Sequence, residues 1–157
     1  MPDDVSKPKR PQISDATLRG LVGYNMKRAF MVIGADLART LEPFELRMLT
    51  FTALTLVADN PGLSQSQLAQ AMQVERPNLV VIVDELETRG LITRDRVPTD
   101  RRVYALRITA AGARLLANAT RAVAAHESAL MGGLSAAEEA GLIAALNRIE
   151  LSKPEKG

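Results

Sequence analysis

The 157-residue chain contains no cysteine, no tryptophan and a single histidine, His126. The absence of cysteine excludes disulfide scaffolds, thiolate metal sites, thiol catalysis and thiol redox sensing. One histidine argues against metal clusters and histidine-based triads. No apolar run approaches the roughly 18 residues of a membrane span, and the first residues, MPDDVSKPKRPQ, lack the hydrophobic stretch of a secretion signal. We therefore expect a soluble, cytoplasmic protein with no metal ion, no cofactor and no membrane partner.

The remaining composition is that of an ordinary globular protein, with 46% hydrophobic and 24% charged residues. A chain of this length is sufficient to form one hydrophobic core. Residues 1–12 include three prolines and little that can be buried, so we expect a flexible tail there. We expect residues 13–157 to form a single domain.

The net charge of +2 is unevenly distributed along the chain. Positions 89 to 107 contain six arginines and two aspartates, which gives this segment a net charge of +4. Such a concentration suits a polyanionic partner, because phosphate contacts gain free energy from counterion release. The alternative is a solvated charged face, which more often includes lysine and alternates in sign. The six arginines are Arg89, Arg94, Arg96, Arg101, Arg102 and Arg107.

Helical periodicity predicts long helices on both sides of this basic segment. The first runs from Ser14 to about Glu42 and ends at Pro43. At 1.5 Å per residue it is roughly 40 Å long, which is more than a small domain needs for itself. The part of a helix that extends beyond its own domain usually contacts a partner subunit. We therefore expect residues 13–42 and 110–151 to be dimerisation helices.

The central residues, 47–109, have the pattern of a winged helix-turn-helix, in which two short helices precede a β-hairpin. Ser64 and Gln67 form a capping box at the start of the first short helix, and Gly90 supplies the left-handed residue that ends the second. The predicted fold class is therefore mainly α-helical with a small β-hairpin. The expected elements are helices 47–58, 64–72 and 77–89, strands 91–94 and 102–108, and helices 110–131 and 135–150, which begin after Thr109 and at the capping box of Ser135 and Glu138.

The helix at 77–89 has two chemically different faces. Its outer face can enter a major groove by its N-terminal end, where Asn78 suits adenine, Arg76 suits guanine or phosphate, and Val81 suits a thymine methyl group. Alternatively, Asn78 is only a capping residue, and Val80 and Val81 belong to the core. The residues expected to pack inward are Leu79, Ile82, Val83 and Leu86.

The tip of the predicted hairpin carries three arginines, Arg96, Arg101 and Arg102. Guanidinium groups suit a DNA minor groove, whose negative potential attracts them. Asp100 is expected to orient a neighbouring arginine through a charge-assisted hydrogen bond. The competing interpretation is that these charges only decorate the surface.

Several motifs along the chain are specific in combination. They are Leu63-Ser64 through Leu68-Ala69, the VDELE segment at 83–87, Gly90-Leu91, Arg94, the Asp100-Arg101-Arg102 wing, and Leu106 to Thr109 followed by Gly112. In these motifs, and over nearly the whole chain after the tail, the sequence resembles the MarR family of bacterial transcription regulators. The resemblance implies a homodimer that binds a palindromic operator in double-stranded DNA, usually as a repressor, and is released by a small ligand. The residues expected to contact DNA are Ser64, Gln65, Arg76, Pro77, Asn78, Val81, Arg94, Arg96, Asp100, Arg101 and Arg102.

Two positions depart from the pattern of that family. Val81 stands where many members carry a polar or basic residue, which puts base contact at this position in doubt. Arg47 stands where a threonine or serine often caps the second helix, so this helix start is capped by water or by another side chain.

The expected effector is organic, because the chain has neither a thiol sensor nor a zinc site. The resemblance implies that it lies between the dimer helices and the DNA-binding part. An apolar wall with Arg28 as the anchor suits a small aromatic carboxylate or its CoA thioester. Alternatively these residues pack helix against helix, while His126 is expected to be a polar residue on the dimer side. The expected ligand-binding residues are Tyr24, Arg28, Met31, Met48, Phe51 and Thr52.

Two other classes of function are an enzyme and a winged-helix module without a ligand. An enzyme is not expected, because the sequence has no glycine-rich phosphate loop, no paired catalytic acids and no nucleophile with a base. The remaining alternative is a winged-helix architectural or protein-interaction module without a small-molecule ligand.

Overall fold

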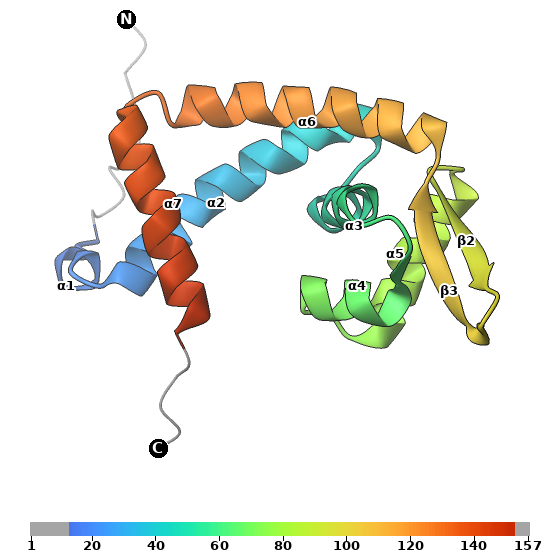
Figure 1. Cartoon of the computed structure of the whole chain (residues 1–157). Coiled ribbons are helices and arrows are strands. Elements are labelled where there is room, and N and C mark those ends of the chain that lie inside the picture. The colour runs from blue at the N-terminus through green and yellow to red at the C-terminus, as the bar shows by residue number, and fades with distance from the viewer. Residues whose placement is uncertain (1–12, 153–157) are drawn as a thin grey trace, which may run out of the picture. The chain divides into compact units, whose positions relative to one another are not determined.

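The computed structural model describes residues 13–152 without the side chains of Arg101 and Arg102, so the tail expected at residues 1–12 lies outside the described residues. The chain divides into two compact units, the first of which ends at Val32. Figure 1 shows the elements in chain order, which are α1 (Ala16–Arg19), α2 (Val22–Leu41), η1 (Glu42–Phe44), α3 (Met48–Asp59), β1 (Leu63–Ser64), α4 (Gln65–Met72), α5 (Arg76–Thr88), β2 (Ile92–Val97), β3 (Asp100–Ile108), α6 (Ala110–Leu130) and α7 (Ala136–Leu151).

The first unit contains α1 and the first half of α2. The prediction of one continuous helix from Ser14 is wrong, because the chain leaves the helical path at Gly20 and Leu21. The side-chain amide of Asn25 donates hydrogen bonds of 2.8 Å to the backbone carbonyls of Arg19 and Leu21, which satisfies polar groups at the break. The apolar periodicity continues across the break and therefore does not reveal it.

In the second unit, the predicted helix caps are confirmed. The Ser64 hydroxyl accepts a hydrogen bond of 3.2 Å from the backbone N–H of Gln67, and the Gln67 side chain accepts one of 2.9 Å in return. Ser135 and Glu138 form the same reciprocal box at the start of α7. Gly90 has φ of +68°, the left-handed conformation expected at the end of α5.

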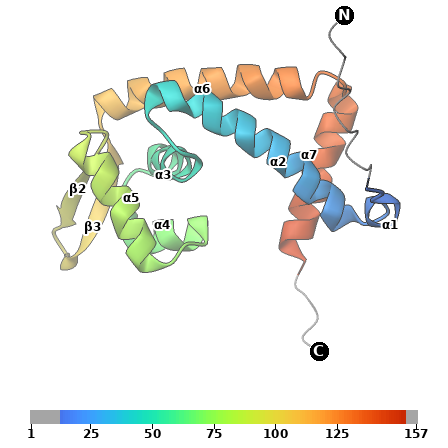
Figure 2. The same ribbon diagram turned by 180° about the vertical axis from the view of Figure 1, so that it is seen from behind.

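The sheet consists of three antiparallel strands in the order β1-β3-β2. Strands β2 and β3 form the predicted hairpin, which we call the wing, and Arg96 pairs with Tyr104 near its tip. The two-residue strand β1 pairs Leu63 with Leu106 and was not predicted, because two residues carry no readable alternation. Figure 2 shows α3, α4, α5 and the wing grouped near the end of α6 that follows β3.

The main hydrophobic core lies between α3, α4, α5 and the sheet. All four α5 residues predicted to pack inward are buried, with Leu79, Val83 and Leu86 fully inaccessible. This confirms the predicted inner face of α5. A second cluster is formed where the end of α2 meets α6, around Leu41 and Ala119.

The start of α6 lies very close to the end of α5. Thr109 accepts a hydrogen bond of 3.0 Å from the backbone N–H of Gly112, and its own N–H donates one of 3.0 Å to the carbonyl of Leu91. A Cβ atom added to Gly112 would lie 2.1 Å from that same carbonyl oxygen. Only glycine therefore permits this approach of helix to backbone.

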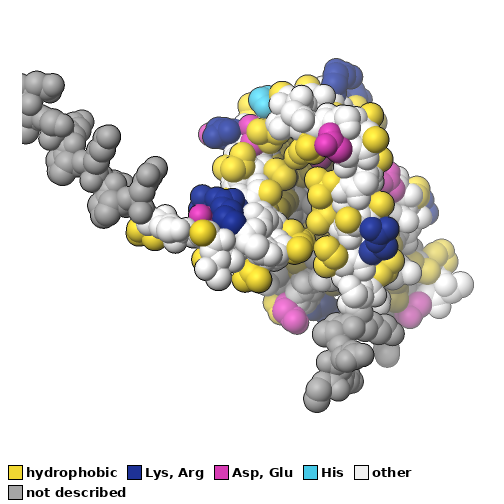
Figure 3. All heavy atoms as spheres, turned by 90° about the vertical axis from the view of Figure 1, so that its left-hand side faces the viewer, with side chains coloured by type: hydrophobic (Ala, Val, Ile, Leu, Met, Phe, Trp, Pro, Cys, Tyr) yellow, Lys and Arg dark blue, Asp and Glu magenta, His cyan; other side chains and the backbone are white. Residues whose placement is uncertain are grey.

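Helix α7 contains no buried residue. Its large apolar side chains are exposed, including Leu142 at 45% and Ile143 at 53%. Figure 3 shows many hydrophobic side chains, in yellow, at the surface of the described residues. No helix in the described part of the chain has the length and apolar character to cross a membrane.

Candidate nucleic-acid interface

The two short helices of the predicted helix-turn-helix are joined by a side-chain contact. Arg76, the first residue of α5, donates a hydrogen bond of 2.8 Å to the hydroxyl of Ser66 in the first turn of α4. Gln65, at the start of α4, is half-buried, whereas Arg76 and Pro77 are exposed. The hydroxyl of Ser64 already caps α4, as described above.

The outer face of α5 is open to solvent. Val81 is 64% exposed and Val80 is 41% exposed, so the alternative that places these two valines in the core is wrong. Asn78 is exposed as well, and the N-cap of the helix is Glu75, which excludes a capping role for Asn78. The N-terminal half of α5 therefore presents an amide and two apolar side chains to solvent.

Arg94 joins the wing to α5 through two carboxylates. This side chain is 19% exposed and forms ion pairs with Asp84 and, at 2.9 Å, with Glu87. Asp84 and Glu87 lie on the same flank of α5, because they are three residues apart. Sequence reasoning assigned Arg94 to DNA and missed both carboxylates, because the pairing joins two different elements.

Two further arginines, Arg89 and Arg47, join the α5 region to the turn between α2 and α3. Arg89 donates hydrogen bonds of 3.0 Å and 2.6 Å to the backbone carbonyls of Phe44 and Glu45. Arg47 forms an ion pair with Glu85 of α5. No sequence signal indicated these contacts, because the paired residues are 38 to 45 positions apart.

At the start of α3, Thr50 bonds back to the backbone of Arg47, while the Arg47 side chain makes no cap hydrogen bond. The backbone N–H of Arg47 donates a hydrogen bond of 2.8 Å to the Thr50 hydroxyl, which itself donates to the Arg47 carbonyl at 3.1 Å. The side chain of Arg47 is thereby left available for its ion pair with Glu85.

The wing presents a positive side chain at its tip. The Arg96 guanidinium is exposed and lies 6.0 Å from the centre of the Tyr104 ring, a cation–π arrangement. Arg107, by contrast, is paired with Asp95 at 3.3 Å. Asp100 is in β3 opposite Val97. The side chains of Arg101 and Arg102 lie outside the described residues, so their predicted DNA contacts stay predictions.

Three of the six predicted ligand-binding residues are in the first unit. The Tyr24 hydroxyl donates a hydrogen bond of 2.7 Å to Asp15, which lowers the pKa of Asp15 and raises the pKa of Tyr24. Arg28 is exposed and lines a shallow hollow beside Arg19. Met31 is 57% exposed. These side chains share one unit but make no direct hydrogen bond with one another.

The other three predicted ligand-binding residues are on α3, in the second unit. Met48 is 43% exposed, whereas Phe51 is half-buried and packs against the cluster around Leu41. The Thr52 hydroxyl donates a hydrogen bond of 2.8 Å to the carbonyl of Met48. Among these three, only Met48 presents a largely exposed apolar side chain.

Comparison with known proteins identifies the family. Residues 46–104 match the MarR family. A putative transcriptional regulatory protein for the hcr operon of Thauera aromatica is 37% identical over 139 residues, which make up 88% of this chain and 84% of that protein. The chain belongs to the MarR family.

Solved structures of MarR-family proteins have the same fold as this one. The transcriptional repressor CouR, solved with a 23-mer DNA duplex, matches with a TM-score of 0.84 and 35% identity over 88% of this chain and 99% of the CouR chain. CouR bound to p-coumaroyl-CoA matches with a TM-score of 0.80 and 32% identity over 90% of this chain and all of that chain. The winged helix and its flanking helices are therefore those of a MarR-family transcription regulator.

Proposed function

We propose that this MarR-family protein is a cytoplasmic repressor that binds a palindromic operator as a homodimer. Helix α5 enters the major groove, and the wing contacts the adjacent minor groove or backbone. An aromatic carboxylate or its CoA thioester binds the dimer and releases the DNA.

The observation that carries this proposal is the charge pairing of α5. The helix contains three carboxylates, and each has an arginine partner from outside the helix. Unpaired carboxylates beside a groove would repel phosphate, and the two arginine partners offset two of the three negative charges. The partners are Arg94 for Asp84 and Glu87, and Arg47 for Glu85.

The homodimer is supported by the apolar surface of α7 and of the first half of α2. Large exposed apolar surfaces are uncommon on monomeric proteins and usually mark an interface. In a twofold dimer, two copies of α5 would meet successive major grooves about 34 Å apart. Such a dimer binds a site with dyad symmetry.

The class of effector is supported by two findings. A structure of CouR contains p-coumaroyl-CoA, the thioester of an aromatic acid. The chain carries no cysteine for a thiol-based switch. The candidate residues for its contacts are Tyr24, Arg28 and Met31 in the first unit, and Met48, Phe51 and Thr52 in the second, each taken within its own unit.

Specific binding can be tested on a duplex selected from a random pool by the purified protein, with a scrambled duplex as reference. Fluorescence anisotropy of Asn78→Ala should show a loss of about 1 to 3 kcal/mol in preference for the operator, with an unchanged salt slope. Asn118→Ala, at an exposed position of α6, is the matched control and should bind as the parent does. Equal loss on both duplexes would mean that Asn78 contacts phosphate.

Release of the protein from operator DNA is tested in the same anisotropy assay by adding aromatic acids and their CoA thioesters. One of them should lower operator affinity and raise the thermal midpoint of the free protein, because a ligand that binds only the folded state stabilises it. Operator binding that no such compound changes would favour the architectural module without a ligand.

A further inference from the structure

A cleft between the end of α2 and the second half of α6 contains one buried hydroxyl without a hydrogen-bond partner among the described residues. It lies within the second unit and has a volume of about 210 Å³. Its apolar walls are Ile33 and Leu37 on α2, and Val123 and Leu130 on α6. An engineered cavity of about 150 Å³ is known to accept benzene, so this cleft has room for one aromatic ring.

Thr40 contributes this hydroxyl, which is buried. The residue is 7% exposed, and its Oγ1 atom makes no hydrogen bond with any described residue. Thr52 and Thr55 on α3, by contrast, each donate to the carbonyl one turn back. A buried hydroxyl without a partner is unfavourable, so this one points to a ligand that completes it.

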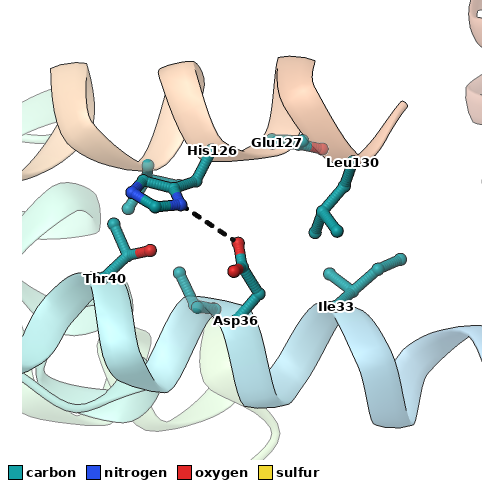
Figure 4. A pocket seen from close by; sticks show the side chains of 8 residues that line it. Ile33, Asp36, Thr40, His126, Glu127 and Leu130 are labelled. Carbon is teal, nitrogen blue, oxygen red and sulfur yellow. Dashed lines mark ion pairs between the residues drawn. The ribbon is translucent and has the colours of Figure 1, made fainter. Parts of the chain in front are cut away.

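Asp36 and His126 approach each other across the same cleft. The Asp36 carboxylate lies 3.6 Å from Nδ1 of His126, and its side chain is 14% exposed. Asp36 is one helical turn before Thr40, so both face α6 from the same side of α2. Figure 4 shows Thr40, Asp36 and Ile33 directed toward His126 and Leu130.

The charges of the cleft exclude an anionic ligand head. Asp36 and Glu127 are both carboxylates, and His126 is the only basic residue in the lining. Asp36 also has an outer partner, Arg39, at 3.1 Å. A carboxylate that has these partners still accepts further hydrogen bonds, but it needs no additional cation. The head group that fits is therefore an uncharged hydrogen-bond donor.

We propose that this cleft binds a phenolic ring, whose hydroxyl donates to Asp36 and accepts from Thr40. None of the six predicted effector residues lines it, so it is an addition to the expected site. The ring belongs either to a free phenol or to the hydroxyaromatic end of an acyl-CoA effector. Only the second source rests on the proposed function.

Calorimetric titration with 4-ethylphenol and with its methyl ether tests the cleft directly. The phenol should bind at least tenfold more tightly, because the ether cannot donate to Asp36. Thr40→Val should reduce phenol affinity about tenfold and leave the ether unchanged. Its thermal midpoint should not fall, because the hydroxyl that it removes has no partner. Thr55→Val, which removes a paired hydroxyl on α3, is the matched control and should retain phenol affinity.

Further titrations identify the source of the ring, and some of their outcomes would contradict the proposal. Tighter binding of a 4-hydroxyphenyl acyl-CoA than of its phenyl analogue, abolished by Thr40→Val, assigns the ring to the effector. If neither thioester releases DNA but the phenol still binds, the proposed effector response is wrong and the phenol site in the cleft is retained. Equal binding of phenol and ether, or tighter binding of benzylamine, overturns the phenol site. A Thr40→Val variant that weakens dimerisation in sedimentation and leaves phenol affinity unchanged overturns it too, because the partner subunit then fills the cleft.

Discussion

Individual arginines in the basic segment have different roles that the sequence alone does not separate. Arg94 and Arg107 are paired with carboxylates of the same chain, while Arg96 is exposed and lies against the Tyr104 ring. The surplus of positive charge was visible in the sequence. The pairing was not, because it depends on side chains that only the fold brings together.

Arg94→Ala should destabilise the protein and weaken DNA binding indirectly. Removing this side chain leaves Asp84 and Glu87 unneutralised, and we expect the free energy of unfolding to fall by about 1 kcal/mol. Urea denaturation measures this loss. Adding Asp84→Asn and Glu87→Gln should restore operator affinity. If affinity stays low in the triple variant, Arg94 contacts DNA itself.

Arg102→Ala should weaken binding to every duplex, whatever its sequence. Loss of one positive contact should reduce the slope of log affinity against log salt by up to about one unit. Anisotropy at several salt concentrations, on operator and scrambled duplexes, gives both values. A variant that binds as the parent does would show that the wing makes no DNA contact at this position.

At the scale of elements, helix caps and inner faces could be predicted, whereas breaks and very short elements could not. Capping boxes join residues three positions apart, so the boxes at Ser64 and Ser135 were visible in the sequence. The break at Gly20 depends on the side chain of Asn25, six residues beyond Arg19. Of the two interpretations of the valines of α5, residue type favoured burial, whereas helical position favoured the exposure that is observed.

The two faces of α5 should respond differently to the same substitution. Val83→Ala removes two methyl groups from a fully buried side chain and should lower the free energy of unfolding by about 1 to 3 kcal/mol. Val81→Ala changes a side chain that is 64% exposed and should alter it by less than about 0.5 kcal/mol. Val81→Ala should instead reduce operator preference. Unchanged preference would mean that Val81 touches no base.

The capping box of α7 should make a pH-dependent contribution to stability. Hydrogen bonds from the backbone N–H and hydroxyl of Ser135 lower the pKa of Glu138 below its ordinary value of 4.5. The contribution is therefore complete above about pH 4.5 and is lost as the pH falls through the lowered pKa. The parent should have a higher thermal midpoint than Glu138→Gln above about pH 4.5. This difference should disappear only below that pH. A constant difference from pH 7 to pH 3 would contradict this.

At the scale of the whole molecule, the exposed apolar helices predict an obligate dimer. The sequence showed the amphipathic pattern of these helices, but their partner lies on another chain, which one sequence cannot reveal. Sedimentation at micromolar concentration should give a dimer, and Leu142→Asp with Ile143→Asp on α7 should give a monomer or an unfolded chain. Loss of dimer should abolish operator binding. A parent protein that sediments as a monomer would contradict the dimer.

The close approach of Gly112 to the Leu91 carbonyl has a consequence for genetics. In a screen for constitutive expression of the target genes, substitutions at Gly112 should be recovered alongside substitutions in α5 and the wing. The two groups differ in protein abundance. Variants altered at the DNA surface should accumulate to the normal level, whereas a side chain at position 112 collides with backbone and leaves a protein that cells degrade. Immunoblotting of the recovered alleles would therefore separate lost contacts from lost folding without purification of any variant.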